Sequence, residues 1–194
     1  MPSLDPQTLD AQTLDPKTTA LVLIDLQNGI VGMDLAPRSG GEIVATAKTL
    51  AATFRQAGAP VILVHVSFAD GLAPPQQVDA PLPSTTPPAD WSDLVAGVKQ
   101  DGDIVVLKHH WGAFTGTDLD LILRRHGVKT IALGGIATNF GVESTARSAW
   151  EHGYDVVLVE DACTSASAEA HAFAVKTIFP RISRVVTVAQ VTLG

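Results

Sequence analysis

The sequence is poor in cysteine and in long apolar runs, and each shortage excludes a class of protein. Its 194 residues include one cysteine, Cys163, so no disulfide can form within the chain, which suits a reducing compartment. No apolar run reaches the roughly 18–20 residues that a membrane-crossing helix needs. The N-terminal segment MPSLDPQTLD has neither the basic nor the apolar region of a signal peptide. We therefore expect a cytoplasmic protein.

Basic residues and ligand-binding motifs are also scarce. The chain has 13 Lys and Arg against 20 Asp and Glu, with no basic cluster, so we expect neither a nucleic-acid nor a membrane partner. The six histidines form no metal-binding pattern, and the adjacent His109 and His110 would point to opposite sides of an extended segment. The glycines of LGGIAT lack dinucleotide-binding spacing. These absences predict a protein without a metal or another cofactor.

What remains has the composition of one globular domain. Apolar residues make up 46% of the chain and the mean hydropathy is +0.24, which is typical of a chain that buries a core. Residues 1–18 contain three short units built around Leu-Asp, with Pro6 and Pro16 among them, and are predicted to form an extended arm. Residues 19–194 are predicted to form a single domain.

Short apolar runs alternate with helical patterns after residue 18. Runs without polar alternation are typical of strands buried on both faces of a parallel sheet. The runs span residues 19–25, 60–66, 103–107, 129–133, 155–159 and 184–188, and the helical patterns span 42–56, 118–125, 139–152 and 168–178. Asn139 is the predicted cap of the third helix. The alternation predicts an α/β fold, namely a three-layer, doubly wound, Rossmann-like domain with a mainly parallel sheet of about six strands.

The segment 68–88 breaks this rhythm. It holds six of the twelve prolines, which cannot donate to a strand ladder. We predict a long loop here, which could be a lid over a site or a passive surface excursion.

Polar residues stand where three of the predicted strands end. Asp25 follows the first run, Lys108 follows the third, and the fourth run leads through GGIATN into a helix. Ligands of doubly wound folds bind outside the carboxyl ends of the strands. An Asp–Lys pair there could move a proton, and the helix N-terminus at Asn139 could stabilise an anion. The alternative is that the charges are solvated and that Gly141, in the first turn, is chance usage.

Aromatic residues supply a second set of candidates. Trp111 and Phe114 follow Lys108 and are predicted either to wall a substrate site or to pack in the core. Trp150 and Tyr154 are candidates for a subunit interface. The full set of predicted substrate contacts is Gln27, Trp111, Phe114, Thr138 and Asn139.

One further pair has a simple structural reading. Arg147 lies four residues after Glu143, so a helical ion pair is the simpler account. Binding of a substrate carboxylate by Arg147 is the alternative.

Two stretches carry a resemblance to a known family. TALVLIDLQNGI (19–30) and the segment from LKHHWGAF to EDACTS (107–165), with GGIATNFGVESTARSAWEHGY inside it, are similar to the isochorismatase-like hydrolases, also called the cysteine hydrolase family. The resemblance implies that Asp25 and Lys108 are catalytic and that a cis peptide bond precedes Ala137. It also implies an oxyanion hole formed by the N–H groups of Ala137 and Gly141, and a homo-oligomer, either a dimer or a tetramer.

The chain departs from the family at the nucleophile. Gly141 occupies the position of the catalytic cysteine in the amidohydrolase members. Isochorismatases also have a glycine there, and they cleave a vinyl ether by proton transfer and water addition. By this resemblance, Asp25 would protonate the vinyl carbon, while Lys108 would hold the substrate or tune Asp25. We therefore expect a hydrolase of a small, carboxylated cyclic substrate.

Three alternatives stay open. The chain could be a catalytically silent member that serves as a binding or assembly protein, as the missing nucleophile suggests. It could be a small-amide hydrolase of unknown mechanism. A cysteine amidohydrolase that uses Cys163 is the third, although that residue follows a different strand and reads as a small buried structural cysteine.

Overall fold

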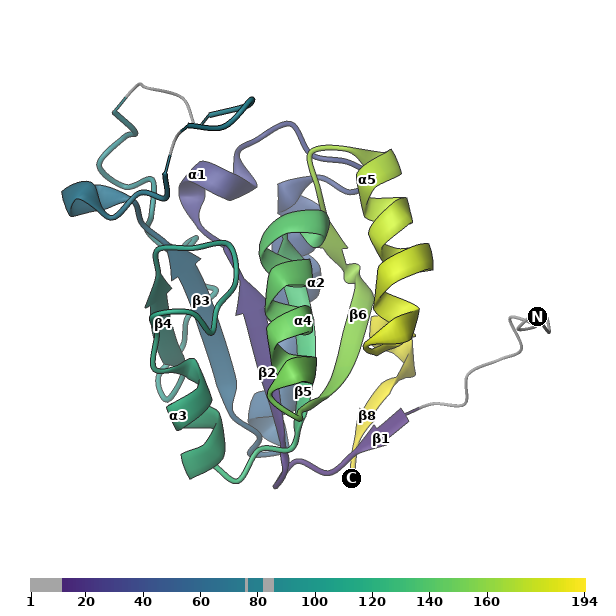
Figure 1. Cartoon of the computed structure of the whole chain (residues 1–194). Helices are drawn as coiled ribbons and strands as arrows, with labels where there is room; N and C mark the ends of the chain where they lie inside the picture. Colours follow the sequence, from purple (N-terminus) through teal and green to yellow (C-terminus); the bar gives the residue numbers. More distant parts are fainter. Residues whose placement is uncertain (1–11, 76, 82–85) are drawn as a thin grey trace.

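A six-stranded parallel sheet forms the centre of the computed structural model, which describes residues 12–75, 77–81 and 86–194. The strands lie in the order β4-β3-β2-β5-β6-β7 (Figure 1). They are β2 (Thr19–Ile24), β3 (Val61–Val66), β4 (Ile104–Lys108), β5 (Thr130–Ile136), β6 (Asp155–Thr164) and β7 (Arg184–Val186). Each ladder is parallel. The predicted doubly wound α/β fold is confirmed.

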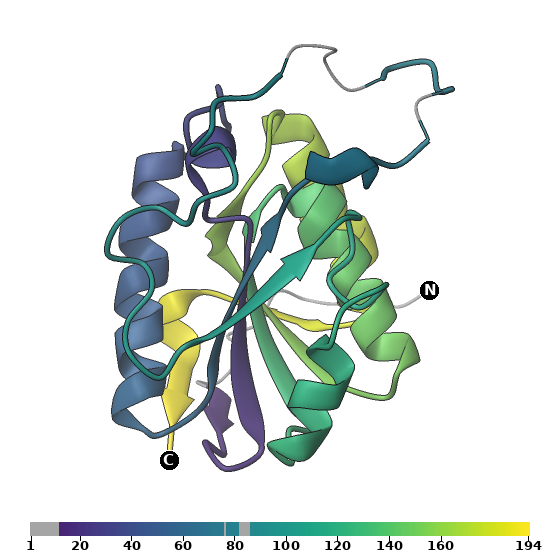
Figure 2. The same ribbon diagram turned by 90° about the vertical axis from the view of Figure 1, so that its left-hand side faces the viewer.

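Helices cover both faces of this sheet. One face packs against α2 (Gly40–Gln56), and the other lies under α3 (Leu119–Arg125), α4 (Glu143–Glu151) and α5 (Ala168–Phe173) (Figure 2). Every residue of β2 is buried, and its side chains alternate between the two resulting apolar clusters. Burial on both faces is why the strand reads as a continuous apolar run.

The strand order reverses between β2 and β5, which places a switch point at the centre of the sheet. The chain winds outward from β2 through β3 to β4, and then returns to pair β5 with the other side of β2. At this seam Gly135 has φ 125°, and a Cβ on it would overlap the backbone of Ile24. Glycine therefore lets β5 lie tightly against the end of β2, where ligands of such folds bind.

The helices differ from the prediction at their ends. The predicted helix 139–152 is a π-helical turn, η2 (Thr138–Val142), followed by α4, and the predicted helix 168–178 is α5 followed by a π-helical segment, η3 (Ala174–Ile178). The prediction that Asn139 caps the helix is wrong, because Ala137 is the N-cap residue and Asn139 lies inside η2. The side chain of Asn139 accepts a hydrogen bond from the Ser165 hydroxyl instead.

Several short elements were not predicted. They are α1 (Asn28–Val31), η1 (Ala69–Gly71), η4 (Phe179–Arg181) and η5 (Val188–Gln190). Strand β1 (Gln12–Leu14) pairs in parallel with β8 (Val191–Leu193) as a separate small sheet. The predicted arm lies largely in residues 1–11, outside the described residues. Of the described residues of this predicted arm, 12–14 form the strand β1, with Leu14 buried, and a turn over 15–18 leads into β2.

Candidate active site

A carboxylate and an ammonium group from distant parts of the chain meet beside the switch point. Asp25 follows β2 directly and Lys108 ends β4, two strands away. Lys108 Nζ lies 2.8 Å from Asp25 Oδ2 and donates a hydrogen bond to it. Asp25 is also the one non-glycine residue with positive φ (53°) in the described part of the chain, a backbone state that is uncommon outside glycine, asparagine and aspartate. The predicted Asp–Lys contact is therefore present.

Burial makes this carboxyl a weak acid for its type. Asp25 is 6% exposed, and loss of hydration raises its pKa to about 6, against the opposing attraction of Lys108. Its second oxygen, Oδ1, is buried and has no hydrogen-bond partner among the described residues. A buried oxygen without a partner favours the protonated acid and leaves one atom to contact a bound molecule.

Lys108 is held from two sides. Its side chain is 1% exposed, and Nζ also donates to the carbonyl oxygen of Trp111 at 2.6 Å. An ammonium has three hydrogens, so the hydrogen bonds to Asp25 and Trp111 leave one hydrogen to donate. The loop after β4 thus fixes the ammonium against Asp25.

Gly141 faces the pair from η2. A Cβ at Gly141 would lie 3.0 Å from Ile24 Cγ2, 3.1 Å from Lys108 Nζ and 3.2 Å from Asp25 Oδ2. The position that the resemblance assigns to the cysteine of the amidohydrolase members therefore faces the Asp25–Lys108 pair, and here it has no side chain.

The cis peptide bond between Ile136 and Ala137, expected from the resemblance, is present. Ala137 follows β5 and is the N-cap residue of η2. Ala137 and Gly141 therefore belong to the same turn, beside the Asp25–Lys108 pair. The oxyanion hole proposed for their N–H groups stays a prediction.

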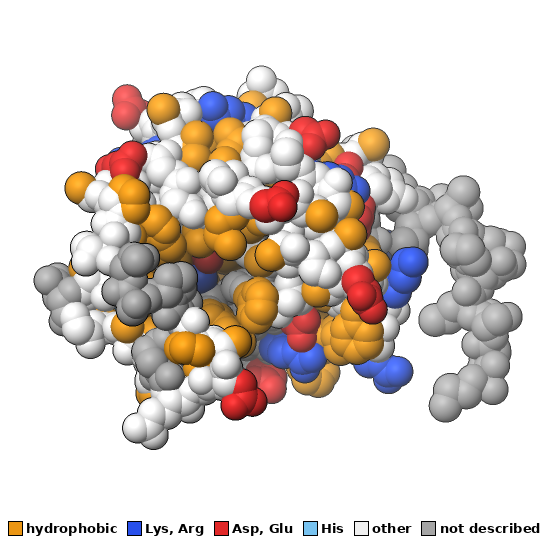
Figure 3. Space-filling view, turned by 90° about the horizontal axis from the view of Figure 1, so that it is seen from above, with side chains coloured by type: hydrophobic (Ala, Val, Ile, Leu, Met, Phe, Trp, Pro, Cys, Tyr) orange, Lys and Arg blue, Asp and Glu red, His pale blue; other side chains and the backbone are white. Residues whose placement is uncertain are grey.

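An exposed aromatic pair lies next to the buried charges. Trp111 is 57% exposed and Phe140 is 41% exposed, and their rings meet edge to face with centroids 4.8 Å apart. Figure 3 looks onto this face, at the carboxyl ends of the strands, which is hollowed near its centre and bordered by hydrophobic side chains. The sequence reasoning missed Phe140. Its place directly before Gly141 was the available signal.

Two predicted substrate contacts have structural partners instead. Phe114 is buried in the core and its ring stacks on His152, the alternative left open by the sequence. Gln27 is buried too, and it donates to the carbonyl oxygen of Val66 and accepts from the N–H of Val66. Both side chains thus serve packing or loop anchoring in this structure.

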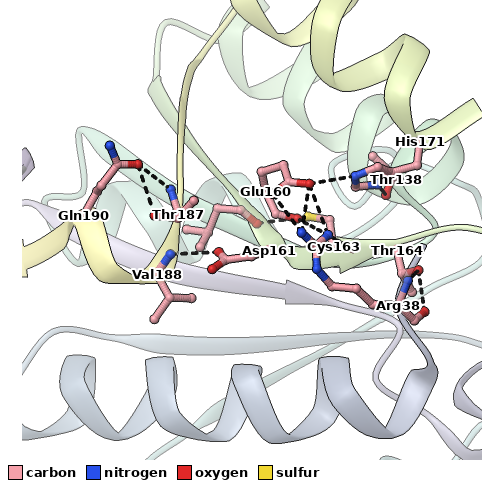
Figure 4. A network of polar contacts seen from close by, with 11 residues as sticks. Arg38, Thr138, Glu160, Asp161, Cys163, Thr164, His171, Thr187, Val188 and Gln190 are labelled. Carbon is pink, nitrogen blue, oxygen red and sulfur yellow. Dashed lines mark hydrogen bonds and ion pairs between the residues drawn. The ribbon is translucent and has the colours of Figure 1, made fainter. Parts of the chain in front are cut away.

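Thr138 opens a chain of polar contacts that the sequence reasoning did not foresee. Its hydroxyl lies 2.8 Å from His171 Nδ1, and His171 Nε2 lies 2.9 Å from Glu160 Oε1. Glu160 also pairs with Arg38 at 3.0 Å. Figure 4 shows these four side chains, drawn from four different segments, in one connected network. A carboxylate just beyond the apolar run of β6 was the signal available for Glu160.

Cys163 does not have the properties of a catalytic cysteine. It is fully buried, donates to the carbonyl oxygen of Val159, and has its pKa raised to about 12 by desolvation. A thiol in this state is not a nucleophile. Within the described part of the chain, no three His, Cys, Asp or Glu side chains gather in a way that could hold a metal ion.

The remaining predicted residues divide between helix surface and core. Arg147 pairs with Glu143 at 2.9 Å, which confirms the helical ion pair. Trp150 is 54% exposed, but Tyr154 is buried and donates to Asp120, so Tyr154 is excluded as an interface residue. No helix in the described residues has both the length and the apolarity to cross a membrane.

Comparison with known proteins gives a consistent result over almost the whole chain. The isochorismatase domain model matches residues 19–190. The isochorismatase family protein YecD of Escherichia coli O157:H7 is 50% identical over 92% of this chain and 96% of its own length. The solved structure of an isochorismatase family protein from Burkholderia thailandensis is 49% identical, covers 92% of this chain and 95% of its own, and superposes with a TM-score of 0.88.

A more distant relative is a named enzyme. The ureidoacrylate amidohydrolase RutB of Pantoea ananatis is 32% identical over 88% of this chain and 80% of its own length. With the parallel sheet, the Asp25–Lys108 pair and the domain match taken together, the chain belongs to the isochorismatase family of hydrolases.

Proposed function

We propose that this protein hydrolyses a small carboxylated cyclic vinyl ether of the isochorismate type, with Asp25 as the general acid and without a covalent thiol intermediate. The observation that carries the proposal is the buried Asp25 carboxyl, paired with Lys108 and with its Oδ1 atom free of hydrogen bonds to the described residues. A pKa of about 6 keeps a useful fraction of this acid protonated near neutral pH.

Proton transfer from Asp25 to the terminal vinyl carbon would begin the reaction. The electron pair of the carbon–carbon double bond forms the new C–H bond, and the ether oxygen stabilises the cation left on the neighbouring carbon. Lys108, 2.8 Å away, stabilises the carboxylate that Asp25 becomes.

Water then completes the hydrolysis. It adds to the oxocarbenium carbon and returns a proton to Asp25, and the hemiketal collapses to pyruvate and the ring alcohol. No step needs a nucleophilic side chain, which agrees with Gly141 at the pair and with the inert state of Cys163. The aromatic pair Trp111–Phe140 would offer an apolar wall for the ring.

The test is pyruvate release from isochorismate, coupled to lactate dehydrogenase, for the wild type and Asp25→Asn. Removal of a general acid costs about 100-fold to 10,000-fold in rate, so we expect release by the wild type and almost none by Asp25→Asn. Asp118→Asn is the matched control, because Asp118 is exposed and its side chain makes no capping bond. Failure of the wild type to release pyruvate would reject this substrate.

Hydrolysis of a small amide is the second candidate, supported by the similarity to RutB. The same Asp25 would then act as a base toward water, since Gly141 supplies no thiol. Ammonia release from ureidoacrylate, measured in parallel, distinguishes the two reactions. Absence of both products would favour the catalytically silent binding protein.

A further inference from the structure

The position of Gly141 depends on how η2 is held, because η2 consists of only five residues. At its first residue, the hydroxyl of Thr138 contacts His171 Nδ1 at 2.8 Å. Thr138 is 0% exposed and His171 is 3% exposed. This hydrogen bond is therefore shielded from water, and it joins the start of η2 to α5.

The far nitrogen of His171 is fixed in turn by a charged pair. His171 Nε2 lies 2.9 Å from Glu160 Oε1, while both terminal nitrogens of Arg38 donate to the Glu160 carboxylate (Figure 4). The hydrogen bond from His171 and the charge of Arg38 lower the pKa of Glu160, so Glu160 is a carboxylate and accepts. Because a carboxylate can only accept, Nε2 of His171 carries the hydrogen that faces Glu160. In the tautomer with that single hydrogen, Nδ1 accepts from the Thr138 hydroxyl.

A second threonine holds the other end of η2. Thr145 Oγ1 donates to the carbonyl oxygen of Gly141 at 2.6 Å and accepts from the N–H of Ala113 at 3.1 Å. Ala113 lies in the loop whose Trp111 carbonyl binds Lys108. The Thr145 bonds thus tie Gly141 to the loop that holds the ammonium.

We propose that Thr138 is a positioning residue, which His171, Glu160 and Arg38 hold so that η2 keeps Gly141 against the Asp25–Lys108 pair. This positioning role extends the proposed function, and the expected effect of Thr138 on turnover rests on that function. The contact distances around Gly141 are 3.0 to 3.2 Å for a Cβ, so a shift of η2 changes the space beside the acid directly. Misplacement by about 1 Å in an active site can cost about 100-fold in rate.

Thr138→Val tests this role, since it keeps the shape of the side chain and removes the hydroxyl. Loss of one buried hydrogen bond corresponds to about tenfold in a local equilibrium. We therefore expect amide hydrogen exchange in a peptide spanning 137–142 to accelerate about tenfold or more, with exchange in β2 unchanged. We also expect kcat to fall about tenfold or more while KM stays within about twofold.

Two further variants sharpen the result. Thr138→Ser restores the hydroxyl and is expected to recover slow exchange and turnover. Thr53→Val is the matched control, because Thr53 loses a comparable hydroxyl bond, to the Thr49 carbonyl, on the exposed side of α2. His171→Phe, which keeps a ring but removes both ring nitrogens, serves if Thr138→Val does not fold. It is expected to show the same faster exchange.

The exchange measurement separates this inference from the proposed reaction. Wild-type exchange rates in 137–142 for folded Thr138→Val or His171→Phe would overturn the positioning role. Faster exchange spread equally over the sheet would overturn it as well, because that result indicates a general loss of stability. If the wild type releases no pyruvate, the proposed function fails, and the exchange result still decides whether Thr138 positions η2.

Discussion

At the residue scale, the proposed chemistry depends mostly on a single carboxyl group. Asp25 lies at the end of a fully buried strand, so the fold removes it from water, and the cost of burying its charge is offset only in part by Lys108. Its acidity is therefore a property of its surroundings rather than of the residue type.

The pH dependence follows from this acidity. The pKa of Asp25 is about 6 in the fold, against 3.8 for an ordinary aspartate in water, so the folded state binds the proton more tightly. Its contribution to the free energy of unfolding is full below about pH 4 and is lost as pH rises through about 6. In the proposed mechanism Asp25 must be protonated to act as the acid, so kcat/KM is expected to fall about tenfold per pH unit above pH 6.

Rate profiles and urea unfolding between pH 4 and 8 measure both effects. As pH rises through this window, the free energy of unfolding of the wild type should fall relative to that of Asp25→Asn. A rate that stays level across pH 6 to 8 would contradict the assignment of Asp25 as the acid.

The missing side chain at Gly141 is the second residue-scale feature. Alanine is more favourable than glycine in a helix by up to about 1 kcal/mol of folding free energy. Its Cβ at position 141, however, would come within 3.0 to 3.2 Å of Ile24, Lys108 and Asp25. We expect Gly141→Ala to lower turnover at least about tenfold, because the methyl group takes the space beside the acid.

Steady-state kinetics together with thermal unfolding test this expectation. Gly41→Ala is the control, since Gly41 lies in the first turn of the helix α2, where a Cβ would meet nothing within 4 Å. Undiminished turnover in Gly141→Ala would show that the space beside the pair is not needed.

At the scale of the elements, α2 and η2 are held at their N-termini in two different ways. The helix α2 begins with a capping box, in which Ser39 accepts from the N–H of Glu42 and the Glu42 carboxylate accepts from the N–H of Ser39. η2 follows another route, since Ala137 offers no capping side chain and the turn is held by tertiary contacts of Thr138 and Asn139.

The capping box predicts a measurable loss on truncation. Ser39→Ala removes one acceptor from the first turn of α2, and we expect the free energy of unfolding to fall by about 1 kcal/mol. Urea denaturation at neutral pH measures this, with Ser148→Ala, in the middle of α4, as the comparison. Equal stability of Ser39→Ala and wild type would show that solvent replaces the cap.

At the scale of the whole molecule, the site is a product of topology. Asp25 and Gly141 follow β2 and β5, and Lys108 ends β4. The parallel order β4-β3-β2-β5 brings the ends of these strands to one edge of the sheet. The homo-oligomer expected from the resemblance remains a prediction. Light scattering against the chain mass of 20.3 kDa would measure it.

Much of this was predictable because it depends on local patterns. Buried parallel strands need apolar residues on both faces, so the six runs predicted the sheet, and strand-end polar residues predicted the Asp25–Lys108 contact. The short ladder β1–β8 was not predictable, because three-residue strands carry too little pattern. The same holds for the burial of Phe114, since an aromatic side chain after a strand suits either a site or the core.

The sequence by itself determined the fold class, the family and the acid–base pair, since each depends on residue type and spacing along the chain. Only the tertiary structure decided the acidity of Asp25, the space beside Gly141 and the contacts that hold η2. Those properties arise from burial and from partners that lie far apart in sequence, such as Thr138 with His171 and Glu160 with Arg38. Hydration and hydrogen-bond geometry are set by three-dimensional neighbours, which no local pattern specifies.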